Sequence, residues 1–130
     1  MRRGPGSLYR QVLSLGFLVT RDRGAVRRFL AAPGELRRRL ALLSRFLAVT
    51  NNVRGYHTLG EMLEIADAIL RRGRLRPPLV VECGVAFGSS TAKLSVAVAA
   101  VGGRLVACDS FRGLPVNAER HRHLDGRTIV

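Results

Sequence analysis

The chain has 130 residues, enough for one small domain with a hydrophobic core. Hydrophobic residues make up 47% of it, which excludes an intrinsically disordered tail. The formal net charge is +13, but aromatic residues are only 5% of the chain, and surfaces that bind single-stranded nucleic acid combine basic with aromatic side chains. A nucleic-acid partner is therefore not expected. Every basic residue except Lys93 is arginine, a bias typical of a GC-rich coding sequence.

No apolar run approaches the ~18 residues of a membrane-spanning helix, so no stable membrane insertion is expected. The two cysteines, Cys83 and Cys108, are too few for a disulfide scaffold and are predicted to be buried, reduced thiols. These features predict a cytoplasmic protein.

Residues 1–50 are predicted to form a basic helical segment, with helices over Ala25–Ala32 and Glu35–Val49. In the second helix, leucines recur with helical spacing and predict the buried face: Leu36, Leu40, Leu43 and Leu47. The arginines of this helix, Arg39 among them, lie mostly off that stripe and are expected to face solvent. An alternative interpretation of this basic segment is a non-catalytic module that binds RNA or an anionic membrane surface.

A capping-box pattern predicts the start of the next helix, with Thr58 as the N-cap and Glu61 three residues later. Hydrophobic residues then recur with helical spacing as far as Leu70, and Gly73 predicts the end of the helix. Residues 51–130 are predicted to form a second segment of the chain, which contains this helix.

Two short apolar runs, Leu79–Cys83 and Arg104–Cys108, predict strands because glycine or proline bounds them. The helix between them is predicted to begin at Ser89–Thr91, which are good N-cap residues, and to end near Val101. Because helices and strands alternate, the predicted fold class is α/β with a parallel sheet. Thr128–Val130 is predicted to begin a third strand.

A sheet of two to three parallel strands leaves its edges unpaired and part of its helices uncovered. We therefore expect an incomplete core, truncated at its C-terminal side and inactive alone, that belongs to a longer protein; the alternative is a truncated gene product. A homo-oligomer stays open as an alternative.

The glycine spacing after the first strand separates the cofactors that such a loop can hold. A P-loop needs Gly-x4-Gly-Lys-Ser/Thr, and the chain lacks this pattern. The dinucleotide fingerprint Gly-x-Gly-x-x-Gly is met only at Gly84, because Ala86 and Ser89 take its other two glycine positions. An NAD(P)-dependent oxidoreductase is therefore the alternative and not the first choice.

The remaining pattern, Glu82-x-Gly84-x-x-x-Gly88 followed by Asp109, resembles the class I S-adenosylmethionine (SAM)-dependent methyltransferases. The segment CDSFRGLP, Cys108–Pro115, is similar to the signature of macrocin O-methyltransferase-like enzymes, as is the preceding loop ECGVAFGSST. The resemblance implies a Rossmann-like methyltransferase core that transfers a methyl group from SAM to a hydroxyl of a sugar or another small natural product. It also implies Mg²⁺ as a further cofactor, held by carboxylates beyond this chain.

The resemblance and the chemistry of SAM together predict a set of cofactor-binding residues. They are Glu82, Gly84, Val85, Gly88, Ser89, Ser90, Asp109, Ser110 and Phe111. The two glycines allow the backbone to approach the methionine portion closely, and the helix N-terminus offers N–H donors to its carboxylate. Glu82 is expected near the cationic end and Asp109 at both ribose hydroxyls. Phe111 is expected either beside the adenine ring or in the core.

Other polar residues carry weaker signals. His57 is a general base by residue type, but a single loop histidine is usually exposed, so no catalytic base is assigned. His121, His123 and Asp125 are typical of a solvated turn, so no residue of this chain is predicted to bind metal.

Overall fold

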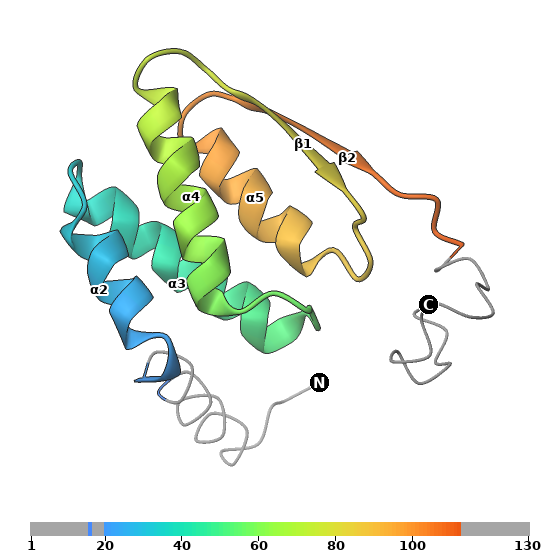
Figure 1. Ribbon diagram of the computed structural model, residues 1–130, viewed down its shortest axis with the longest axis horizontal. Helices are drawn as coiled ribbons and strands as arrows, with labels where there is room; N and C mark the ends of the chain where they lie inside the picture. Colours follow the sequence, from blue (N-terminus) through green and yellow to red (C-terminus); the bar gives the residue numbers. More distant parts are fainter. Residues whose placement is uncertain (1–15, 17–19, 113–130) are drawn as a thin grey trace, which may run out of the picture.

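The computed structural model describes residue 16 and residues 20–112 of the chain. Within these residues, the chain forms four helices and a two-stranded parallel sheet, and the helix between the two strands packs against the second strand (Figure 1). The elements are α2 (Arg23–Ala31), α3 (Leu36–Asn52), α4 (Leu59–Gly73), β1 (Leu79–Cys83), α5 (Ser89–Ala99) and β2 (Arg104–Cys108). The predicted α/β class is confirmed at this level. The predicted third strand and the His121–Asp125 cluster lie outside the described residues.

Both strands have the predicted bounds, and they pair in parallel from Leu79 opposite Arg104 to Cys83 opposite Cys108. A parallel pair requires a crossover, which α5 provides. Consequently the carboxyl ends of both strands and the N-terminus of α5 lie at the same edge of the sheet.

The two faces of the sheet differ in burial because successive side chains of a strand alternate between faces. Val80 and Leu105 pack against the hydrophobic core. Helix α5 lies along one face of the sheet (Figure 1). On the other face the large apolar side chains are exposed: Leu79, Val81 and Val106. Cys83 and Cys108 are also exposed, so the prediction of buried thiols was wrong.

One hydrophobic core joins all four helices, and α3 crosses residue 50 to contribute to it. Its buried members are Val26, Phe29, Leu42, Leu43, Phe46, Leu59, Met62, Leu63, Ala66, Ile69, Leu70, Leu94, Ala97 and Val98. No helix in the described part of the chain is both long and apolar enough to cross a bilayer.

Helix α3 buries only part of the predicted face: Leu43 is buried and Leu47 packs against the core, as predicted, but the N-terminal half of the leucine stripe is exposed. Its buried residues are Arg39, Leu42, Leu43 and Phe46, whereas Leu36 and Leu40 are 54% and 47% exposed. The buried face is rotated because Phe46 and the side chain of Arg39 both pack inward, and Arg39 finds polar partners there. The expectation that Arg39 faces solvent was therefore wrong.

The predicted capping box of α4 is confirmed. The Glu61 backbone N–H donates to Thr58 Oγ1 at 3.2 Å, and the Thr58 N–H donates to Glu61 Oε2 at 2.7 Å. These bonds hold the pKa of Glu61 below its usual value, with the backbone hydrogen bond from Thr58 as the main cause. The capping box thereby fixes the start of α4 at Leu59, directly after the segment that connects α3 to α4.

Gly103 is required by the close approach of the chain to Pro78. A Cβ at position 103 would lie 2.6 Å from the Pro78 carbonyl oxygen, a backbone atom that itself accepts the Arg104 N–H at 2.9 Å. We expect Gly103→Ala to lower the free energy of unfolding by about 1–3 kcal/mol, measured by urea denaturation. Gly24→Ala in α2 is the control, because its Cβ meets nothing closer than 3.5 Å. Equal stability of the Gly103→Ala variant and the unmodified chain would contradict this account.

Candidate functional site

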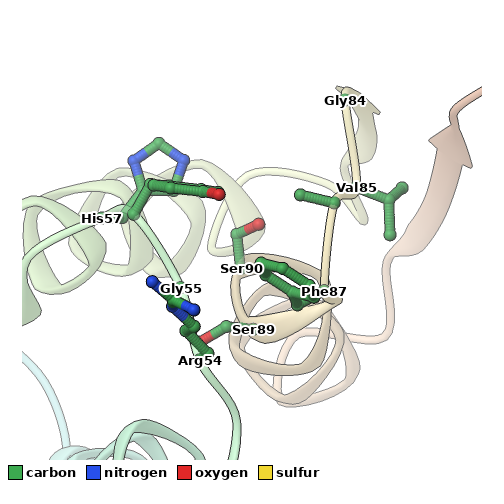
Figure 2. Close-up of a pocket in the computed structure, with 10 residues that line it drawn as sticks. Arg54, Gly55, His57, Gly84, Val85, Phe87, Ser89 and Ser90 are labelled. Atoms are coloured by element: carbon green, nitrogen blue, oxygen red, sulfur yellow. The ribbon is translucent and has the colours of Figure 1, made fainter. Parts of the chain in front are cut away.

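The candidate site lies at the edge of the sheet where β1 ends and α5 begins. The loop Gly84–Gly88 connects these two elements, and residues 54–57, between α3 and α4, lie opposite it (Figure 2). A small cavity of about 60 Å³ lies between the two segments, and Ser89 and Ser90 complete its wall. No acidic side chain of the described residues lines this cavity.

Three contacts hold residues 54–57 against the loop. A Cβ at Gly55 would lie 2.6 Å from Ser89 Cβ, so only glycine allows this approach. The Tyr56 ring stacks on Phe87 with 6.2 Å between centroids, and the Arg54 guanidinium lies 6.0 Å from the Phe87 centroid. The sequence analysis did not select Phe87 or Arg54, because their partners are more than thirty residues away in the chain.

Both loop glycines have the backbone conformation that favours glycine. Gly84 has φ +91° and Gly88 has φ +79°, and a Cβ at either position would meet no atom within 4 Å. The predicted N-cap at Ser89–Thr91 was wrong, because the left-handed Gly88 is the N-cap and the serines lie inside α5. Without a side-chain cap, the first N–H groups of α5 have no side-chain acceptor.

Asp109 connects the end of β2 to the loop. Its Oδ2 accepts the backbone N–H of Val85 at 2.5 Å and of Ala86 at 3.1 Å, and its Oδ1 accepts that of Phe111 at 2.8 Å. These hydrogen bonds, that from Phe111 first, hold the pKa of Asp109 below its usual range. The sequence predicted that Asp109 lies at this edge of the sheet. It did not indicate that the Asp109 side chain binds the loop.

These bonds limit what else Asp109 can accept. A carboxylate offers about four lone-pair positions, and three of them already receive backbone N–H groups. One hydroxyl can therefore be accepted at Oδ1 without disturbing the loop, whereas a second hydroxyl requires the release of one N–H.

The residues that follow Asp109 turn away from the core. The Ser110 hydroxyl oxygen accepts the Arg112 N–H at 3.3 Å. Phe111 has φ +53° and its ring is 73% exposed. The expectation that Phe111 packs in the core was therefore wrong, and its ring is free to contact a ligand.

Glu82 is the one buried acid of the sheet among the described residues. It lies on β1, two residues before Gly84, and is only 9% exposed. Its Oε2 atom has no hydrogen-bond partner in the described part of the chain. Because buried carboxylate oxygens are normally paired, this atom indicates a missing cationic or hydrogen-bonding partner at this edge.

The residues present fit SAM only in part. The open space above Gly84 and Gly88 and the unpaired Glu82 oxygen suit a cation beside a close backbone. The cavity, by contrast, is far below the 300–1,000 Å³ of typical ligand pockets. A ligand of that size would therefore extend over the open loop.

Metal-binding side chains do not gather here. Within residue 16 and residues 20–112, no three His, Cys, Asp or Glu side chains form a group that could hold a metal ion. His57 Nδ1 lies 4.0 Å from Glu61 Oε2, and both side chains are exposed.

Comparison of the chain with protein-family models, curated proteins and solved structures finds no match. The geometry at the carboxyl edge of the sheet therefore carries the functional argument.

Proposed function

We propose that this chain forms the cofactor-binding part of a SAM-dependent O-methyltransferase that acts on a hydroxyl of a sugar or another small molecule. The observation that carries the proposal is the unpaired, buried Oε2 of Glu82, two residues before the glycine loop that begins at Gly84. An uncompensated carboxylate at this position suits a cationic cofactor, whereas the phosphates of a dinucleotide would be repelled by it.

Each part of the site has a role in this proposal. Bound SAM would supply an electrophilic methyl group on a positively charged sulfur. Glu82 attracts that positive charge, and the uncapped N–H groups of Ser89 and Ser90 are suited to the methionine carboxylate. Asp109 accepts one ribose hydroxyl at Oδ1 while it keeps its hold on the loop. The catalytic contribution of such a site is mainly to hold the reacting groups in position.

Glu82→Gln tests the role of the buried carboxylate. The substitution keeps the shape of the side chain and removes its charge, so we expect SAM affinity to fall by about 10- to 100-fold, the effect of losing a charged partner. Titration calorimetry measures the affinity. Glu64→Gln is the matched control, because Glu64 is exposed on α4 and lies outside the site. Unchanged SAM affinity in Glu82→Gln would contradict the assignment.

A thermal-shift comparison separates this function from its rivals. We expect SAM to raise the melting temperature and NADH to leave it unchanged; a larger shift with NADH would favour an oxidoreductase. Binding to RNA or anionic vesicles that weakens with salt and survives Asp109→Ala would instead favour a basic binding module.

A further inference from the structure

The only lysine of the chain is buried in α5. Lys93 is 2% exposed, and its Nζ lies 3.3 Å from Ser89 Oγ, one helical turn earlier. No carboxylate oxygen of the described residues forms an ion pair with Nζ. A hydroxyl is therefore the polar partner of a buried amine.

The charged groups around α5 do not compensate Lys93. Helix α5 packs against α3, α4 and β2. On α3 the buried charge is Arg39, which is paired with Asp67 of α4, and the other charged side chains of these two helices are exposed. The one charge of β2, Arg104, is exposed, and the buried Glu82 of β1 forms no ion pair. Burial without a counter-charge lowers the pKa of Lys93.

Ser89 connects this amine to the cavity. Its side chain is 4% exposed, and it forms part of the cavity wall opposite residues 54–57 (Figure 2). An uncharged amine can accept the Ser89 O–H, which leaves the serine lone pairs free to accept a hydrogen bond from a ligand. Arginine cannot lose its proton in this way, so the one lysine among arginines stands where deprotonation matters.

We propose that Ser89 and Lys93 form a proton relay that takes the proton of a hydroxyl group bound in the cavity. The inference rests on the proposed function, which provides the hydroxyl acceptor. The acceptor O–H bond breaks and its proton bonds to Ser89 Oγ. The Ser89 O–H bond breaks in turn, and that proton bonds to Lys93 Nζ, giving an ammonium and an unchanged serine. The acceptor oxygen keeps the electron pair of the broken O–H bond and is thereby made nucleophilic.

The wall of the cavity favours the same step. Arg54 lines it and no acidic side chain does so among the described residues, so negative charge that develops on the acceptor oxygen meets a positive group.

The titration of the Lys93 amine can be measured without any ligand. Because Lys93 is the only lysine, lysine labelled with ¹³C and ¹⁵N gives a single side-chain signal in the NMR spectrum. We expect this signal to titrate below the ordinary lysine range and to shift in Ser89→Ala. The control Ser95→Ala, on the exposed side of α5, should leave it unchanged. Titration in the ordinary lysine range would overturn the relay.

Methyl transfer by the full-length protein gives the second test, with SAM labelled with tritium in its methyl group and a monosaccharide as the probe acceptor. We expect Lys93→Met and Ser89→Ala to lower the transfer rate by about 10²- to 10⁴-fold, the usual contribution of general base catalysis, and Lys93→Met to leave SAM affinity unchanged. Lys93→Met should fold, because methionine has a similar volume and leaves no buried amine that needs a polar partner. Transfer at the unmodified rate in Lys93→Met would overturn the relay. If SAM does not bind but Lys93 titrates as expected, the proposed function is contradicted, whereas the pairing of an uncharged Lys93 amine with Ser89 is supported.

Discussion

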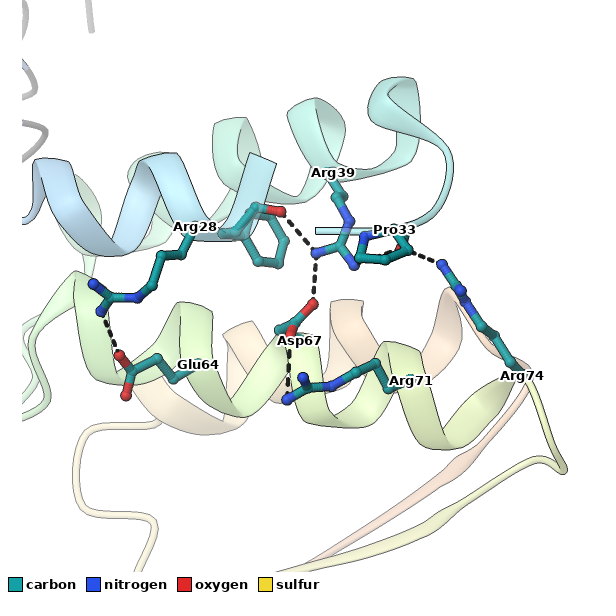
Figure 3. Close-up of polar contacts among 8 residues, drawn as sticks. Arg28, Pro33, Arg39, Glu64, Asp67, Arg71 and Arg74 are labelled. Atoms are coloured by element: carbon teal, nitrogen blue, oxygen red, sulfur yellow. Dashed lines mark hydrogen bonds and ion pairs between the residues drawn. The ribbon is translucent and has the colours of Figure 1, made fainter. Parts of the chain in front are cut away.

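Replacing Asp67 with alanine is expected to lower the free energy of unfolding by about 3–5 kcal/mol, the cost of leaving a buried charge without its partner. Asp67 on α4 lies 2.7 Å from Arg39 on α3, and Arg39 is only 2% exposed (Figure 3). Without Asp67 the guanidinium keeps its positive charge in this buried position and loses its acidic partner.

The surroundings of Arg39 explain why it cannot simply move outward. Its guanidinium donates to the carbonyl oxygens of Phe29 at 2.8 Å and Pro33 at 3.1 Å, and it lies 4.9 Å from the centre of the Phe29 ring (Figure 3). Arg74 from the end of α4 also donates to the Pro33 carbonyl. These bonds tie the turn between α2 and α3 to α4.

Urea denaturation of two single variants separates this buried pair from a surface pair on the same helix. Glu64→Ala removes an ion pair with Arg28 whose side chains are 69% and 65% exposed, and should cost about 0–1 kcal/mol. The double variant Asp67→Leu with Arg39→Met should recover most of the lost stability, because no unpaired charge remains. A loss no larger in Asp67→Ala than in Glu64→Ala would contradict the proposed role of Arg39.

Gly88→Leu is expected to reduce SAM binding below detection by calorimetry. The open space at this position is where the proposed ligand approaches the backbone, and a leucine side chain would fill it. Gly102→Leu is the matched control, since Gly102 has φ +66° and equally open space but lies before β2, away from the site. Both variants carry similar backbone strain, so only Gly88→Leu should abolish binding. Equal SAM affinity in the two variants would remove Gly88 from the site.

Asp109→Ala is expected to abolish SAM binding as well, because it removes both the ribose acceptor and the group that holds the loop. The pH dependence follows from the lowered pKa of Asp109. A carboxyl with a pKa lower in the folded than in the unfolded chain stabilises the fold above its unfolded pKa, and this contribution is lost as the pH falls through the folded pKa. Acid titration of loop amide signals by NMR should therefore show the loop opening only below the ordinary aspartate range.

The local parts of the fold were predictable because neighbouring residues determine them. Pro78 and Gly84 bound β1, and the strand bounds were predicted correctly. The capping box at Thr58 was predictable because both of its partners lie within one helical turn. The parallel pairing followed from the order of elements alone, since a helix between two strands provides a crossover.

Tertiary contacts determined which charged side chains are buried or paired and how the candidate site is arranged. The leucine spacing of α3 predicted one buried face, but Arg39 could be buried only because Asp67, twenty-eight positions later, compensates its charge. Likewise, the sequence pattern around Asp109 indicated an acid that binds a ligand. In the folded chain Asp109 also accepts the Val85 N–H and so holds the loop in place. In the sequence, Lys93 is only the single lysine among many arginines, and the packing of α5 is what buries it. Hydrophobic spacing is a property of adjacent turns, but the environment of a charge depends on distant segments, so only the folded chain specifies which ionisable groups are paired, buried or free to react.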